Sequence, residues 1–211
     1  SALAIERWRM VAERAGADAI ALVGMEEGGH PGMNELPTML MGALALGQFS
    51  VPVVLGGGIG RGKQLAAVLA QGLDGVLIGS RFLVCEEIQT HPRYKEHLLT
   101  CDEHSTVRLL QSLGTTWRVL LNDTARQVQA IERAGATEHA AFSDLISGTV
   151  ARDRCYAEGE WRHGMVSLGP SIAFAKRIEP LRAIVNCMVD EAAQAIAALH
   201  ATHSQNGMEQ E

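Results

Sequence analysis

The stretch Val51–Phe82 constrains the fold more than any other part of the chain. An apolar run rich in β-branched residues ends there in three consecutive glycines, Gly56–Gly58. A segment with helical periodicity follows, and a second apolar run, Gly75–Ile78, ends in Gly79 and Ser80. This order predicts a strand, a glycine turn, a helix and a second strand, which together form one βαβ unit of a parallel sheet.

Small residues follow both predicted strands: Gly57 and Gly58 after the first, Gly79 and Ser80 after the second. Glycine lets backbone N–H groups approach an anion closely, and the N-terminus of a following helix adds partial positive charge. Glycines also end parallel strands for purely structural reasons, so one such cluster is a weak signal. Two clusters a helix length apart favour a phosphate site, which barrels commonly place after their last two strands.

His30 is the strongest candidate for acid–base chemistry. It lies in a Gly-rich loop directly after a predicted buried strand, residues 17–23, and before a predicted helix, residues 36–46. Loops at the carboxyl ends of parallel strands carry the chemistry in such folds, and an imidazole there can exchange a proton near neutral pH. The alternative is a loop histidine that only bonds to backbone. The phosphate site predicted at the next two strand ends favours the functional interpretation.

Composition excludes several classes of function. The 211 residues carry a net charge of −6 without a block of Lys or Arg, which argues against a nucleic-acid groove. The four cysteines are widely spaced, so we interpret them as reduced thiols of a cytoplasmic protein and not as a disulfide framework or zinc site. No apolar run reaches the roughly 18 residues of a membrane span, and no signal peptide is visible.

The character of the chain changes after Phe82. We predict C-terminal βα units in residues 1–85, including a first helix over residues 5–14. Residues 86–165 are predicted to form a mainly helical appendage, with helices over 106–113 and 124–134. Residues 166–200 are predicted to be helices that pack back on the first part, the last one opened by Pro180. Residues 201–211 are predicted to be a disordered tail.

Only three strand–helix units are visible, whereas an eight-stranded barrel usually has about 250 residues and at least about 200. About half of this chain is the predicted helical appendage. A parallel sheet of three strands would leave its edges and one apolar face exposed. We therefore expect an α/β fold of the TIM-type (β/α)8 barrel, of which this chain carries only the C-terminal βα units plus the helical appendage. A second chain or a removed segment would supply the missing strands, and a start directly in a helix is consistent with a cut. The sequence also leaves open the assembly of identical chains into a homo-oligomer.

Three segments carry a resemblance to a known family: GADAIALVGMEEGGHPG at 16–32, PVVLGGGI at 52–59 and LDGVLIGSRFLVCEE at 73–87. Together they resemble the FMN-dependent nitronate monooxygenases, formerly called 2-nitropropane dioxygenases, and the related FMN-dependent enoyl-acyl-carrier-protein reductases. The family pattern is roughly E-A-G-G-H-x-G, A-G-G-I and M-G-T-R-F in this order. The resemblance continues through HPRYKEHLL, TWRVLLN and the region after residue 155. It covers nearly the whole chain and implies that the family's amino-terminal strands are absent.

The resemblance implies roles for seven residues. His30 would be the active-site histidine beside the flavin ring, and Gly28 and Gly29 would shape its loop. The FMN phosphate would be held by the strand-end residues Gly57, Gly58, Gly79 and Ser80.

Three positions depart from the family pattern. Glu27 stands where Ala is usual, Ser80 replaces Thr but keeps the hydroxyl, and Pro170 stands where Gln is frequent. Glu26 and Glu27 could contact a ribityl hydroxyl or a partner, or form a solvated pair.

The function that the resemblance implies is oxidation of an alkyl nitronate by O₂, through FMN, to a carbonyl compound and nitrite. Two alternatives stay open. One is an NAD(P)H-dependent enoyl-acyl-carrier-protein or quinone reductase on the same scaffold, because both branches share the flavin residues. The other is a flavin-binding subunit that needs a partner chain and has no turnover of its own.

Overall fold

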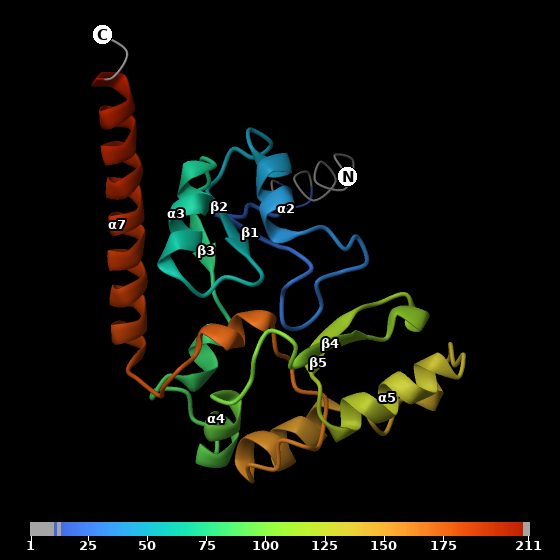
Figure 1. Ribbon diagram of the computed structural model, residues 1–211. Helices are drawn as coiled ribbons and strands as arrows, with labels where there is room; N and C mark the ends of the chain where they lie inside the picture. Colours follow the sequence, from blue (N-terminus) through green and yellow to red (C-terminus); the bar gives the residue numbers. More distant parts are fainter. Residues whose placement is uncertain (1–10, 12–13, 209–211) are drawn as a thin grey trace.

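The computed structural model describes Val11 and residues 14–208, with side chains as far as residue 201. The helix predicted over residues 5–14 falls mostly outside this range. In the described part, an upper body with a parallel sheet lies above a lower body with a hairpin and short helices, and a long helix runs along one side (Figure 1).

The upper body is a three-stranded parallel sheet in the order β1-β2-β3, with helices packed on one of its faces. Val23 pairs with Gly56, and Gly56 pairs with Leu77, so the three strands end side by side. The βαβ unit predicted over residues 51–82 is therefore confirmed, as is the α/β class. The elements are β1 (Ile20–Val23), α2 (Thr38–Ala45), β2 (Val53–Gly56), α3 (Gly62–Ala70) and β3 (Gly75–Leu77).

The lower body contains an antiparallel hairpin, in which β4 (Thr106–Leu109) pairs with β5 (Trp117–Leu120). The prediction of a helix over 106–113 was wrong. The short run TVRLL has too few residues to hold a helix by local periodicity alone, and pairing with β5 buries Leu109. Leu110 and Gly114 adopt left-handed backbone angles, φ 67° and 69°, at the two ends of the turn.

The remaining elements of the lower body are short, apart from the predicted helix over 124–134, which is confirmed as α5. They are η1 (Ser80–Val84), α4 (Pro92–Leu98), η2 (Gln111–Leu113), α5 (Asp123–Arg133), η3 (His139–Ala141), α6 (Gly148–Val150), the π-helix η4 (Ala151–Ala157) and η5 (Pro170–Phe174).

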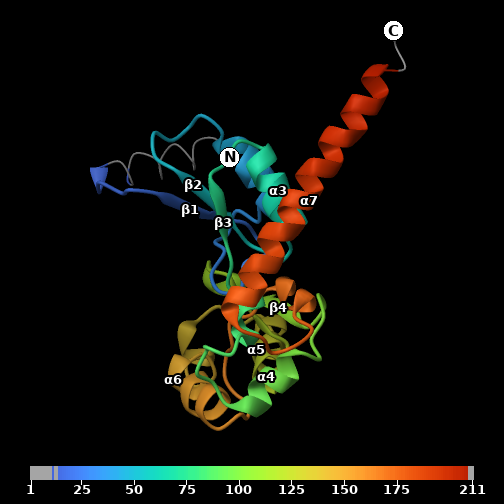
Figure 2. The ribbon, with the colours of Figure 1, turned by 90° about the vertical axis from the view of Figure 1, so that its left-hand side faces the viewer.

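Helix α7 (Leu181–Met208) begins directly after Pro180, as predicted, and packs lengthwise on α3. Figure 2 shows it extending well past the sheet. Residues 201–208 belong to the segment predicted to be a disordered tail, but α7 continues through them to Met208. Among the described residues, no helix is long and apolar enough to cross a membrane.

The buried side chains form three clusters that follow this division. One lies between the sheet and helices α3 and α7, with Leu55 and Val68 fully buried. A second joins η1, α4, η4 and η5 around Tyr94. A third fills the space between the hairpin and α5 around Phe142. The ends of the parallel strands thus lie above a separately packed lower body.

Candidate functional site

A cavity of about 320 Å³ lies at the carboxyl ends of the three parallel strands. It gathers the predicted phosphate-site residues of both strand-end turns, together with Gly28 from the loop after β1. His30 and Gly29 do not line it. Its lining residues are Val23, Glu26, Glu27, Gly28, Gly57, Gly58, Ile59, Leu77, Ile78, Gly79, Ser80, Leu83, Ser167 and Ser171.

The two glycine turns present bare backbone to this cavity. Gly57 and Gly58 have φ angles of +106° and +69°, which side chains rarely adopt, and a Cβ on Gly57 would lie 2.6 Å from the Thr38 hydroxyl oxygen. Within the described part of the chain, the N–H groups of Gly58 and Gly79 donate no hydrogen bond. Unpaired amides that converge on one cavity form an anion-binding concavity.

Ser80 adds a hydroxyl to the same wall. It is the first residue of η1, and its Oγ accepts a hydrogen bond of 2.7 Å from the N–H of Gly169. The serine side chain is thereby fixed, and its own hydrogen remains available to donate into the cavity. Ser80 is therefore suited to donate a hydrogen bond to a phosphate oxygen, in addition to its structural bond with Gly169.

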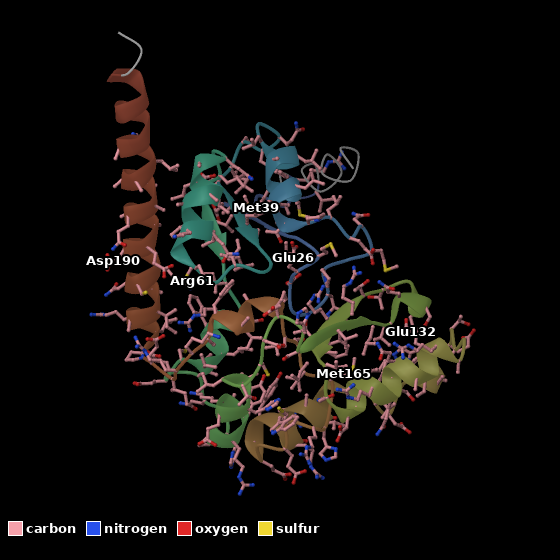
Figure 3. All side chains as sticks on the ribbon, in the orientation of Figure 1. Glu26, Met39, Arg61, Glu132, Met165 and Asp190 are labelled. Atoms are coloured by element: carbon pink, nitrogen blue, oxygen red, sulfur yellow. The ribbon has the colours of Figure 1, made fainter. Side chains whose placement is uncertain are left out.

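The two neighbouring glutamates have different surroundings. The Glu26 carboxylate accepts hydrogen bonds from the N–H and the hydroxyl of Thr38, at 3.0 and 2.6 Å, and so fixes the start of α2. Glu27 is half-buried on the cavity wall, and its carboxylate has no hydrogen-bond partner among the described residues. Burial raises the pKa of Glu27. Figure 3 places Glu26 between the sheet and the hairpin.

His30 is exposed, and its imidazole stacks on the indole of Trp117 with ring centroids 4.8 Å apart and 28° between the planes. The backbone of its loop is bonded to β5 as well. Gly29 N–H donates to the Arg118 carbonyl at 3.0 Å, and Arg118 N–H donates to the Gly29 carbonyl at 2.7 Å. The hairpin of the lower body therefore holds the loop that carries the predicted histidine.

Arg118 makes a further contact with this loop through its side chain. Its Nε and one terminal nitrogen donate to the Met25 carbonyl at 3.2 and 3.1 Å, and the other donates to Thr106 Oγ1. Burial, together with the charge of Arg108, lowers the pKa of Arg118. The sequence analysis singled out neither Arg118 nor Trp117. The only signal was the resemblance extending through TWRVLLN, because the contact between Arg118 and Met25 joins residues 93 positions apart.

The residues present fit the phosphate end of FMN. A phosphate needs several convergent donors and little side-chain bulk, and the cavity offers glycine amides and three serines, Ser80, Ser167 and Ser171. Its size is at the low end for ligand pockets, which suits part of a flavin more than the whole molecule. Among the described residues, no cluster of three or more His, Cys, Asp or Glu side chains is placed to hold a metal ion.

Known proteins resemble this chain over most of its length. A nitronate monooxygenase of Paraburkholderia phytofirmans is 29% identical over 195 residues, which are 89% of this chain and 52% of that protein. FabK from Thermotoga maritima superposes with a TM-score of 0.83 and 30% identity, covering 93% of this chain and 61% of that one. A nitroalkane oxidase from Streptomyces ansochromogenes superposes with a TM-score of 0.71 and 27% identity, covering 92% and 57%.

The chain thus spans about half the length of the curated relative and about three fifths of the solved structures. The profile of the nitronate monooxygenase family matches residues 1–191. This chain belongs to the nitronate monooxygenase family.

Proposed function

We propose that this chain carries the FMN phosphate site and the active-site histidine of a flavoprotein that oxidises alkyl nitronates with O₂ to a carbonyl compound and nitrite. The observation that carries the proposal is the cavity at the strand ends, where two glycine turns and Ser80 converge. Family membership and the likeness to a nitroalkane oxidase support the choice of chemistry.

Each residue has a distinct task in this proposal. The N–H groups of Gly58 and Gly79 and the hydroxyl of Ser80 donate to the phosphate. Gly28 and Gly57 allow the loops behind it to pack closely, against the Leu168–Gly169 backbone and the Thr38 hydroxyl. FMN, when bound, supplies the electron-transfer chemistry. His30 holds the anionic nitronate or takes the α-proton of a neutral nitroalkane.

The sheet also supports the partial-barrel proposal. Leu22, Leu55 and Val76 share the face packed against the helices, whereas the opposite face bears the exposed Ala21 and a Leu77 that is 46% exposed. In a (β/α)8 barrel that opposite face is the filled interior. We propose that further strands, from another segment of a longer protein or from a second chain, cover it.

The role of His30 is testable in the full-length, FMN-loaded protein. His30→Ala should lower turnover of 2-nitropropane nitronate by about 10²- to 10⁴-fold, the usual contribution of a general acid or base. The flavin absorbance should be unchanged, because the phosphate contacts lie elsewhere. His104→Ala is the matched control, since that side chain is 85% exposed and lies outside the cavity. Unchanged turnover in His30→Ala would remove His30 from the mechanism.

The second candidate is an NAD(P)H-dependent enoyl-acyl-carrier-protein or quinone reductase, which the likeness to FabK favours. Anaerobic mixing with NADH or NADPH separates the two candidates. Rapid bleaching of the flavin would favour the reductase, whereas bleaching by the nitronate alone supports the proposed oxidation. A bound flavin that neither reagent reduces would indicate a flavin-binding subunit.

A further inference from the structure

The indole of Trp117 connects the predicted histidine to the wall of the cavity. One face stacks on the His30 imidazole at 4.8 Å. The indole N–H donates to Ser167 Oγ at 2.9 Å, and Ser167 lines the cavity. Because Trp117 is also the first residue of β5, its backbone is anchored in the hairpin.

The same hairpin also contacts a later part of the loop, at Glu35. Beyond the Gly29–Arg118 pair, the Glu35 carboxylate accepts hydrogen bonds of 2.7 Å from Arg108 and from Gln111. Glu35 has a left-handed φ of +48°, which a non-glycine residue adopts only when its surroundings fix it. The backbone around His30 is therefore well defined although the histidine side chain is exposed.

The imidazole itself is held differently. Among the described residues, no hydrogen bond fixes the His30 ring. The ring instead stacks on the Trp117 indole. An exposed side chain without a hydrogen bond samples several rotamers. A flat aromatic surface beside it removes part of that freedom, because only some rotamers keep the ring contact.

We propose that Trp117 is a positioning residue for His30: the hairpin presents its indole as the surface that orients the imidazole. This inference rests on the proposed function of His30. Placement of a reacting group within about 1 Å matters, since a larger error can lower a rate by roughly 100-fold. The hairpin is then a part of the active site and not only an appendage.

The test compares variants of the full-length, FMN-loaded protein. Trp117→Leu should lower kcat for 2-nitropropane nitronate by about 10- to 100-fold, with the flavin content unchanged. Trp117→Phe keeps an aromatic face and should retain most of the rate. Ser167→Ala removes the hydrogen bond of the indole and should fall between the two.

A second measurement reports on the stack without reference to turnover. The ring current of an indole shifts the NMR resonances of protons stacked on it. The His30 ring protons, assigned by their absence in His30→Ala, should move toward the positions of free histidine in Trp117→Leu and less in Trp117→Phe.

The chain offers a matched control. Trp161 stacks on His97 at 3.4 Å and 7°, and neither residue lines the cavity. Trp161→Leu should therefore leave kcat within about twofold of the starting protein, because the stack of Trp161 is with His97 and not with the loop that carries His30.

Two results would overturn the inference. One is a Trp117→Leu protein that keeps its kcat while His30→Ala loses turnover. The other is a set of His30 ring resonances that do not move in Trp117→Leu. If His30→Ala itself keeps turnover, the proposed function fails, and the resonances alone decide whether the stack exists. Should Trp117→Leu not fold, Ser167→Ala takes its place in both measurements, and Trp117→Phe is then the variant that keeps the aromatic face.

Discussion

At the scale of single residues, Glu26 and Glu27 show how much the sequence leaves open. Both are neighbouring carboxylates in one loop, and their order alone gives no reason to treat them differently. The loop turns Glu26 toward Thr38, where two hydrogen bonds use its carboxylate, and leaves Glu27 on the cavity wall without a partner. Both residues line the cavity, but only the Glu27 carboxylate stays unpaired there among the described residues.

The raised pKa of Glu27 gives a prediction with a definite sign. The folded chain keeps the Glu27 proton to a higher pH than the unfolded chain, whose value is near 4.5, so ionisation of this group costs stability as pH rises. Glu27→Gln should stabilise the apo protein at pH 7 and lose that advantage below pH 4.5. The gain should be on the order of 0.5 kcal/mol, because solvent screens a half-exposed group.

Thermal unfolding of the apo protein between about pH 4 and 8 measures this effect. Glu26→Gln is the control, and it should lower stability at neutral pH because it weakens the hydrogen bonds to Thr38. If Glu27→Gln raised the stability equally at pH 4 and at pH 8, the raised pKa of Glu27 would be contradicted.

At the scale of elements, the sequence predicts what depends on local order. Glycine turns and apolar runs locate β2, α3 and β3 within a few residues, because the period of each run and the residue that ends it are neighbours in the chain. The hairpin could not be found in this way. The run TVRLL is compatible with a helix. It is a strand because it pairs with β5, which begins farther along the chain at Trp117.

A single glycine, Gly62, allows α3 and α7 to approach each other closely. A Cβ on Gly62 would overlap the carbonyl oxygen of Met188 and lie 2.8 Å from the N–H nitrogen of Ala192. Glu191 reinforces this contact, since its carboxylate accepts from Gly62 N–H at 2.8 Å and from the Arg61 guanidinium, which Figure 3 shows between the two helices. The N-terminus of α3 is therefore fixed by α7.

Gly62→Ala should destabilise the protein by about 1–3 kcal/mol, because two backbones must separate to admit one methyl group. Helix propensity alone predicts the opposite sign, since Ala is the better helix former. Gly148→Ala is the matched control, as nothing lies within 4 Å of its Cβ, and it should be neutral. Urea unfolding measures both variants, and wild-type stability in Gly62→Ala would contradict this account.

At the scale of the whole molecule, the candidate site belongs to neither body alone. The parallel sheet contributes the glycine turns, while the lower body contributes Trp117, Ser167 and Ser171. The sequence predicts the first set, because each turn follows its own strand. It cannot predict the second set, because no local pattern indicates that a residue near 30 contacts one near 117.

The exposed face of the sheet, opposite the helices, leads to the last prediction. Ala21 is exposed there and does not line the cavity, so a charge at this position should be tolerated in the 211-residue chain, within about 0.5 kcal/mol. In the full-length protein the same Ala21→Asp should be strongly destabilising, by several kcal/mol, because further strands would bury the carboxylate without a partner. Ala130→Asp, on the exposed side of α5, should have little effect in either form. Thermal unfolding of the four proteins decides the matter: an Ala21→Asp effect that is equally small in both forms would mean that no strand covers this face.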